Sequence, residues 1–291
     1  MTKPLVALFA AVLIAAGCYK ADTAALPAAP NHKANAKVLL TDAPFPFDSV
    51  QSVNVYVVRI AVSTHSDTGT SADSMHWVTV VEPHRQIDLL TLQQGMTDSL
   101  GNGEVTADLY KAVQLTLNTD SSAGIRFKNG SQAVVHWNGS GFESYNLFVE
   151  APINVPDTGA VIVIDFDVAK SFPYNQRGDG AFDFFPAPRA VNRAATGSIA
   201  GTVAHDASVG GSVGPVADAI VSVWTGAPNW WTLSTGRTDA TGHYRLAYLL
   251  PGTYLVSVDP PYGNSSVRGA ADSSVAVNKG FETTRNFTLH P

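Results

Sequence analysis

The chain has 291 residues, of which 45% are apolar and 14% are charged, and its formal net charge is −6. This length suggests two domains that each bury a core of their own, and the low charge excludes a disordered acidic tail. Eighteen Lys and Arg against 24 Asp and Glu leave no basic excess to attract nucleic acid, and the single Cys excludes a disulfide framework and a Cys-based zinc site.

The first eighteen residues have the pattern of a bacterial lipoprotein signal. Lys3 gives a positive start, residues 5–14 are an apolar run, and the small residues Ala15, Ala16 and Gly17 precede Cys18. Small residues before a Cys resemble a lipobox, in which the thiol takes a diacylglycerol before the signal is cut. We therefore expect a signal peptide over residues 1–17 and a membrane anchor through a lipidated Cys18.

An ordinary secretory signal and an uncleaved anchor helix are the alternatives for this segment. The apolar run is shorter than the ~20 residues that a membrane-spanning helix needs, which disfavours the anchor helix. Tyr19 follows the Cys, so no acidic retention signal is present, and in a diderm bacterium this favours the outer membrane of the cell envelope. Residues 18–35 are rich in Ala, Pro and Asn, and we expect a flexible tether there.

Residues 36–192 are expected to form a β-sandwich, because their apolar residues recur with period two. Val53, Val55 and Val57 alternate in this way, and residues 161–168 form a largely β-branched run that is typical of a strand buried on both faces. Turn residues at 129–130 and 157–159 separate such runs. One short helix or helical turn is expected at residues 87–94.

Three stretches of this domain resemble an uncharacterised bacterial lipoprotein domain family. They are Leu-Leu-Thr-Asp-Ala-Pro at 39–44, Ile-Asp-Leu-Leu-Thr-Leu at 87–92 and Ile-Asp-Phe-Asp-Val-Ala-Lys-Ser at 164–171. The resemblance covers residues 36–192. It implies a fold and an envelope location but no activity, because the family is defined only as a domain of unknown function.

Residues 196–291 have the pattern of a second β-sandwich. Asp239 and Gly242 flank a tight turn, and Tyr254, Val256 and Val258 alternate on a strand. Thr-Asp-Ala-Thr-Gly-His-Tyr at 238–244 and Leu-Pro-Gly-Thr-Tyr at 250–254 are similar to the carboxypeptidase-regulatory-like, transthyretin-type module. Such modules carry no peptidase chemistry, so the expected fold is all-β, with two β-sandwich domains in tandem.

Two acids in an apolar run are the first candidate site. Asp165 and Asp167 are two residues apart, so on a strand both carboxylates would point to the same face. Buried carboxylates need a cation, hydrogen bonds or protons; Lys170 is the nearest counter-ion, and Asp42 could join from another strand. Asp42, Asp165 and Asp167 could ligate Ca²⁺ through oxygen. We favour a structural cluster, because no Asp-x-Asp-x-Asp-Gly loop surrounds them.

The second candidate is a pair of adjacent tryptophans. Trp230 and Trp231 follow Asn229 in the connection between two expected strands. Neighbouring residues on a strand point to opposite faces, so at least one indole should be exposed, and an exposed indole can stack on a sugar ring. The alternative is that one Trp closes the end of the core and the other has no role.

No nucleophile elbow, phosphate-binding loop, dinucleotide fingerprint or His-Glu-x-x-His zinc motif occurs. The sequence therefore favours a non-catalytic envelope lipoprotein that needs no cofactor and presents a surface to a glycan or an envelope protein. One alternative is a structural spacer or assembly subunit. Another is a hydrolase in which the acids of the first domain converge in a cleft, about 5–9 Å apart, as general acid and base.

Overall fold

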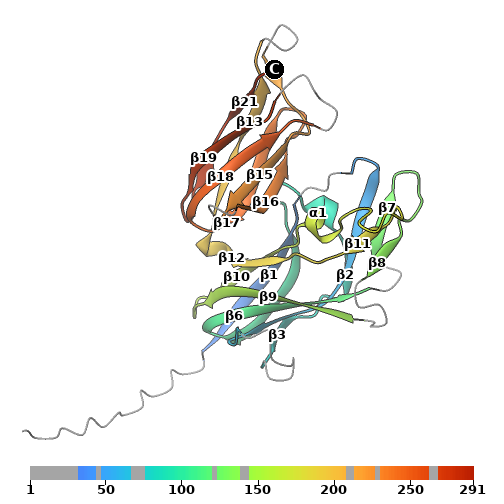
Figure 1. The fold of residues 1–291 in the computed structure, drawn as a ribbon. Coiled ribbons are helices and arrows are strands. Elements are labelled where there is room, and N and C mark those ends of the chain that lie inside the picture. The colour runs from blue at the N-terminus through green and yellow to red at the C-terminus, as the bar shows by residue number, and fades with distance from the viewer. Residues whose placement is uncertain are drawn as a thin grey trace, which may run out of the picture. The chain divides into compact units, whose positions relative to one another are not determined.

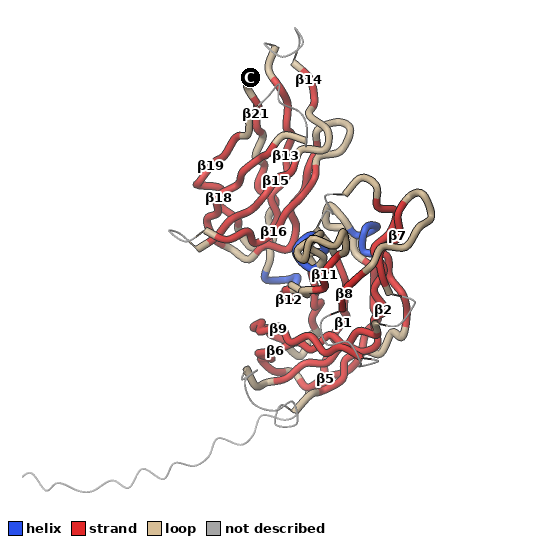
Figure 2. Tube along the Cα trace, turned by 45° about the vertical axis from the view of Figure 1, so that its right-hand side comes forward, coloured by secondary structure: helices blue, strands red, loops and turns tan. Residues whose placement is uncertain are grey.

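The structure, a computed structural model, describes residues 32–43, 47–66, 76–119, 123–137, 144–207, 213–226, 230–261 and 268–291. It is nearly all β, which confirms the predicted fold class (Figures 1 and 2). Residues 32–291 form one compact unit. Within the described ranges, no helix has the length and apolar character needed to cross a membrane.

The first sandwich extends from β1 to β12. Its strands are β1 (Lys33–Thr41), β2 (Val50–Ser63), β3 (Val78–Val81), β4 (Arg85–Asp88), β5 (Asp98–Thr106), β6 (Asp108–Asn118), β7 (Gly124–Phe127), β8 (Val135–Trp137), β9 (Ser144–Val155), β10 (Ala160–Asp165), β11 (Phe182–Phe184) and β12 (Arg189–Asn192). The 3₁₀ turn η2 (Leu89–Leu92) and the short helix α1 (Val168–Ser171) interrupt them. β1 begins three residues before the expected domain start at 36, because Ala34 and Ala36 already face the core.

Two large sheets, together with the two-stranded sheet of β8 and β11, enclose the first core. One has the strand order β12-β10-β1-β5, with β1 and β10 parallel, and in the other β2 and β6 are the central strands, joined by β3, β4, β7 and β9. Figure 1 shows the first sheet lying over β6 and β9. Val38 and Leu40 of β1 belong to the same buried apolar cluster as Leu115 and Leu117 of β6, as the period-two pattern requires.

The second sandwich follows the 3₁₀ turn η3 (Arg193–Ala195). Its strands are β13 (Gly197–His205), β14 (Gly214–Pro215), β15 (Ile220–Thr225), β16 (Trp231–Arg237), β17 (His243–Leu249), β18 (Gly252–Asp259), β19 (Ala270–Val277), β20 (Glu282–Thr284) and β21 (Phe287–Leu289). One sheet has the antiparallel order β16-β15-β18-β19, and in the other β13 pairs with β14, β17, β20 and β21. Tyr254, Val256 and Val258 point into a separate second core, as predicted.

The turn before β17 has the chemistry that the sequence predicts. Asp239 Oδ1 accepts hydrogen bonds from the main-chain nitrogens of Thr241, at 2.8 Å, and His243, at 3.0 Å. Gly242 has a φ of +78°, and a Cβ there would lie 2.5 Å from the carbonyl oxygen of Val203. Only glycine fits this position without displacing β13.

Candidate functional site

The predicted strand containing both acids is shorter than expected. β10 ends at Asp165, so the prediction that it continues to residue 168 is wrong. Asp167 adopts a left-handed backbone, with a φ of 49°, and its Oδ1 accepts a hydrogen bond from Lys170 N at 3.2 Å. Asp167 is thus the N-cap of α1 and does not share a strand face with Asp165.

Two cations hold these carboxylates. Asp165 Oδ2 lies 2.6 Å from Nη2 of Arg189 and accepts a hydrogen bond from its Nε at 2.8 Å. Asp167 Oδ2 lies 2.5 Å from Nζ of Lys170. Burial raises the pKa of Asp167, and the Lys170 ammonium opposes that rise. Both acids are almost fully buried, so these ion pairs offset the loss of hydration that burial imposes.

Asp42, directly after β1, is the third buried carboxylate beside Asp165 and Asp167. Its Oδ1 accepts a hydrogen bond from Val168 N at 2.8 Å, which joins the end of β1 to α1. Burial is the main cause that raises the pKa of Asp42 well above its ordinary value; the Val168 hydrogen bond opposes the rise, and the nearby charges of Asp165 and Asp167 add to it. Asp42 Oδ2 and Asp165 Oδ1 accept no hydrogen bond, and the space that both residues line measures only about 10 Å³.

This geometry provides neither a cleft nor a set of open ligands. A space of that size holds about one water molecule. In the part of the chain that the structure describes, no group of three or more His, Cys, Asp or Glu could hold a metal ion. The arrangement matches the structural cluster; a Ca²⁺ ion at Asp42, Asp165 and Asp167 stays a prediction.

The two cations also connect the sandwiches. Arg189 Nη1 donates a hydrogen bond to the carbonyl of Tyr248, at 2.7 Å, and Nη2 donates to that of Ala247, at 3.3 Å. Lys170 Nζ donates to the carbonyl of Thr232 at 2.9 Å. The buried acids of the first sandwich therefore position side chains that hold the main chain of the second. We call this set of contacts the joint.

Apolar packing reinforces the joint. Leu39, Val163 and Val191 form a small buried cluster apart from the main core, and Tyr248 of β17 packs against it. The Tyr248 hydroxyl donates to the carbonyl of Gly95 at 3.2 Å. Sequence reasoning missed Arg189 and Tyr248, because neither lies in a motif and 59 residues separate them.

Trp230 and Trp231 are both exposed, at 42% and 57%. A Cβ built on Gly226 would lie 1.8 Å from the benzo ring of Trp231, so this ring occupies the space beside the bare backbone. Gly226 also has a φ of +84°, which favours glycine. The absence of a side chain at Gly226 therefore leaves the space that the Trp231 ring occupies. Asn229 and Cys18 lie outside the described residues.

Comparison with solved structures finds distant matches. The GBS52 minor pilin of Streptococcus agalactiae is 10% identical, with 87% of this chain and 95% of that chain covered and a TM-score of 0.24. The TIE protein of Bacillus anthracis is 10% identical, with 89% and 34% covered and a TM-score of 0.25. The shaft pilin SpaA of Lactobacillus rhamnosus GG is 9% identical, with 89% and 98% covered and a TM-score of 0.23. Scores this low establish neither a common fold nor a common function.

Sequence comparison gives a family. No curated protein matches the chain. A family model described as "Domain of unknown function (DUF4382)" matches residues 33–186, which include all but the last strand of the first sandwich and the three buried acids. The chain therefore belongs to the DUF4382 family.

Proposed function

We propose that this chain is a lipid-anchored, non-catalytic protein of the bacterial cell envelope that presents a carbohydrate-binding surface. The observation that carries the proposal is the Trp231 ring, which is placed beside the backbone of Gly226 and remains more than half exposed. The C–H face of a sugar ring stacks on such an apolar plane. Trp230, directly before it, adds a second exposed indole.

The buried acids support a role without catalysis. A glycosidase needs two carboxyls that flank a substrate cleft, with room for water or the sugar between them. Here Asp165 and Asp167 are paired with Arg189 and Lys170, and the space beside Asp42 is about the size of one water. The similarity of residues 196–291 to the carboxypeptidase-regulatory-like module, which carries no peptidase chemistry, agrees with this assignment.

The sequence before the first strand supports the anchor. Cys18 follows small residues and an apolar run, and the residues up to 35 have the composition of a tether. Labelling of the full chain with a palmitate analogue in a diderm host should mark the wild type and leave Cys18→Ala unmarked. Equal labelling of both proteins would contradict lipidation at Cys18.

The binding proposal is tested with the full-length chain on a glycan array and on cell-wall polysaccharides. The Trp230→Ala, Trp231→Ala double variant should lose binding. Phe148→Ala, which removes a 40% exposed aromatic side chain of the first sandwich, should keep it. Binding that survives in the double variant, or no binding by a folded wild type, overturns the proposal.

A second candidate function is a structural spacer or assembly subunit. The joint favours it, because Arg189, Lys170 and Tyr248 fix one sandwich to the other. If the chain is a spacer or assembly subunit, it should bind no glycan, and its function should be lost when the contacts of the joint are removed. Cross-linking of envelope proteins to the wild type, lost in a variant with a loosened joint, would support it over the first.

A further inference from the structure

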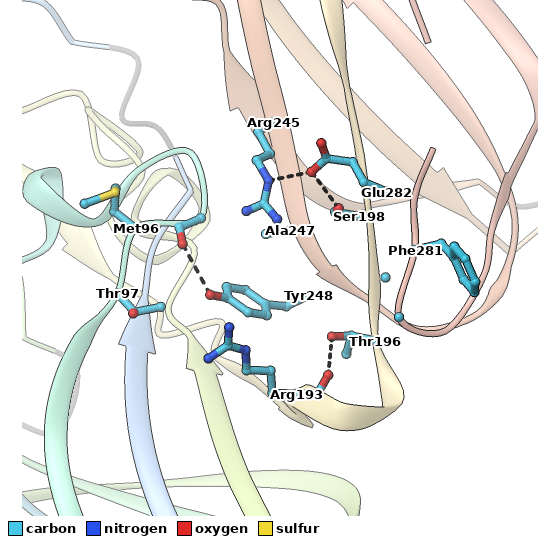
Figure 3. Close-up of a pocket in the computed structure, with 13 residues that line it drawn as sticks. Met96, Thr97, Arg193, Thr196, Ser198, Arg245, Ala247, Tyr248, Phe281 and Glu282 are labelled. Carbon is cyan, nitrogen blue, oxygen red and sulfur yellow. Dashed lines mark hydrogen bonds and ion pairs between the residues drawn. The ribbon is translucent and has the colours of Figure 1, made fainter. Parts of the chain in front are cut away.

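A large cavity borders the joint and plays no part in the proposed indole surface. It measures about 650 Å³, within the range of small-molecule sites. Figure 3 shows its walls: Met96 and Thr97 from the loop after η2, Arg193 from η3, and Arg245, Tyr248, Phe281 and Glu282 from the second sandwich. Cavities where two modules meet are frequent ligand sites.

The charged side chains of this cavity leave one cation uncompensated. Arg245 Nε donates to Glu282 Oε2 at 2.7 Å, and Ser198 Oγ donates to the same oxygen at 2.9 Å. The hydrogen bond from Arg245 is the main cause that lowers the pKa of Glu282, and the one from Ser198 lowers it further, so Glu282 is ionised at neutral pH. Arg193 is exposed and has no ion pair among the described residues. The walls thus carry a net charge of +1, and a guanidinium binds a carboxylate through two parallel N–H groups.

An aromatic ring stands beside this cation: Figure 3 shows Tyr248 next to Arg193, whereas the exposed side chains of Phe281 and Met96 are directed away from it. Tyr248 has a φ of +57°, which is rare for a bulky residue. Arg189 and the Gly95 carbonyl hold it in that conformation, with its ring at the cavity (Figure 3). Such strain is concentrated at ligand sites.

We propose that this cavity binds a carboxylate-bearing sugar, with the carboxylate on Arg193 and the C–H face of the sugar ring against Tyr248. A purely apolar ligand would remove water from the Arg245–Glu282 pair without replacing its hydrogen bonds, whereas sugar hydroxyls can bond to both groups. The inference goes beyond the proposed function, because it assigns a second site that does not need Trp230 or Trp231.

Calorimetric titration of the full-length chain tests this site with four probes. They are a galacturonic acid disaccharide, the neutral galactose disaccharide of the same linkage, acetate and inorganic phosphate. We expect the acidic disaccharide to bind at least about tenfold more tightly than each of the others, and the binding to weaken as salt is added. Equal affinity for the neutral sugar, for acetate or for phosphate, or no binding of the acidic sugar, overturns the proposal.

Variants separate this site from the indole surface. Arg193→Ala should weaken binding of the acidic disaccharide by about tenfold or more. Arg268→Ala is the matched control, because Arg268 is an exposed arginine that does not line the cavity. The Trp230→Ala, Trp231→Ala variant should bind the acidic disaccharide like the wild type. Equal weakening by Arg193→Ala and Arg268→Ala, or loss in the tryptophan variant, contradicts the assignment.

Discussion

Arg189 of the first sandwich donates a hydrogen bond from Nη1 to the main-chain carbonyl of Tyr248 in the second, over 2.7 Å. Its Nε and Nη2 hold the buried carboxylate of Asp165 at the same time. One guanidinium therefore pairs with one oxygen of a buried acid and joins two sandwiches that have separate cores. Asp165 of the first sandwich thus contributes to a contact that extends beyond its own domain.

Replacing this guanidinium should loosen the joint. In Arg189→Lys the ammonium cannot reach the carboxylate and both carbonyls with the same planar geometry, so we expect the free energy of unfolding to fall by about 2 kcal/mol. Proteolysis near residues 193–197 should become faster. Arg85→Lys is the control, because Arg85 pairs with the part-exposed Asp98 inside the first sandwich. Cleavage at the wild-type rate in Arg189→Lys would contradict this role.

Neutralising Asp42 should stabilise the protein more as pH rises. The pKa of Asp42 is higher in the folded protein than its ordinary value in the unfolded chain. Protonated Asp42 therefore stabilises the fold below the unfolded pKa, and this stability is lost as the pH rises through the folded pKa. Asp42→Asn stays neutral at every pH and keeps an oxygen that can accept from Val168 N. We expect its melting temperature to exceed that of the wild type by more at about pH 8 than at about pH 4.

The control for Asp42 is Asp157→Asn, which changes an exposed carboxyl in the turn after β9. Calorimetric melting of both variants across the same pH range separates a buried carboxyl from a general change of net charge. A difference between Asp42→Asn and the wild type that is the same at every pH would show that the pKa of Asp42 does not change on folding, and one that shrinks as pH rises would show that folding lowers it; either contradicts the prediction.

Moving the Trp231 ring without removing it tests the indole surface in a second way. In Gly226→Ala the new Cβ would meet the ring at 1.8 Å, so the exposed ring must shift. The positive φ should cost about 1 kcal/mol of stability. Gly130→Ala is the control: Gly130 has a similar φ of +86°, but no atom lies within 4 Å of the Cβ that alanine would add. This variant therefore has the backbone cost of the positive φ without a clash with a side chain. Glycan binding should fall in Gly226→Ala only, and equal binding by both variants would argue against a pre-positioned indole.

The sequence predicts the sandwiches because their cores follow a period of two. Val53, Val55 and Val57 are buried together, and residues 254–258 alternate as expected. Asp167 shows where this reasoning fails. A β-branched run favours a continuous strand, while Asp is a preferred N-cap residue, and here Asp167 caps α1.

The joint could not be predicted from periodicity. Tyr244 and Leu246 face the second core, so the pattern would place Tyr248 there as well. A register shift between β13 and β17 inserts an extra residue, and Leu249 enters the core in place of Tyr248. Tyr248 then packs on the cluster of the first sandwich. A bulge of this kind changes which face a side chain occupies without changing residue type, so the composition of the strand does not reveal it.

Truncating Tyr248 tests how much the apolar part of the joint contributes. Tyr248→Ala removes the ring that packs on Leu39, Val163 and Val191, and we expect a loss of about 2 kcal/mol in urea unfolding. Tyr248→Phe keeps that packing and loses only the 3.2 Å hydrogen bond to Gly95, so it should cost less than about 1 kcal/mol. If the two variants lost equal stability, the hydroxyl and not the ring would hold the sandwiches together. If neither lost any, the polar contacts of Arg189 and Lys170 would be sufficient for the joint.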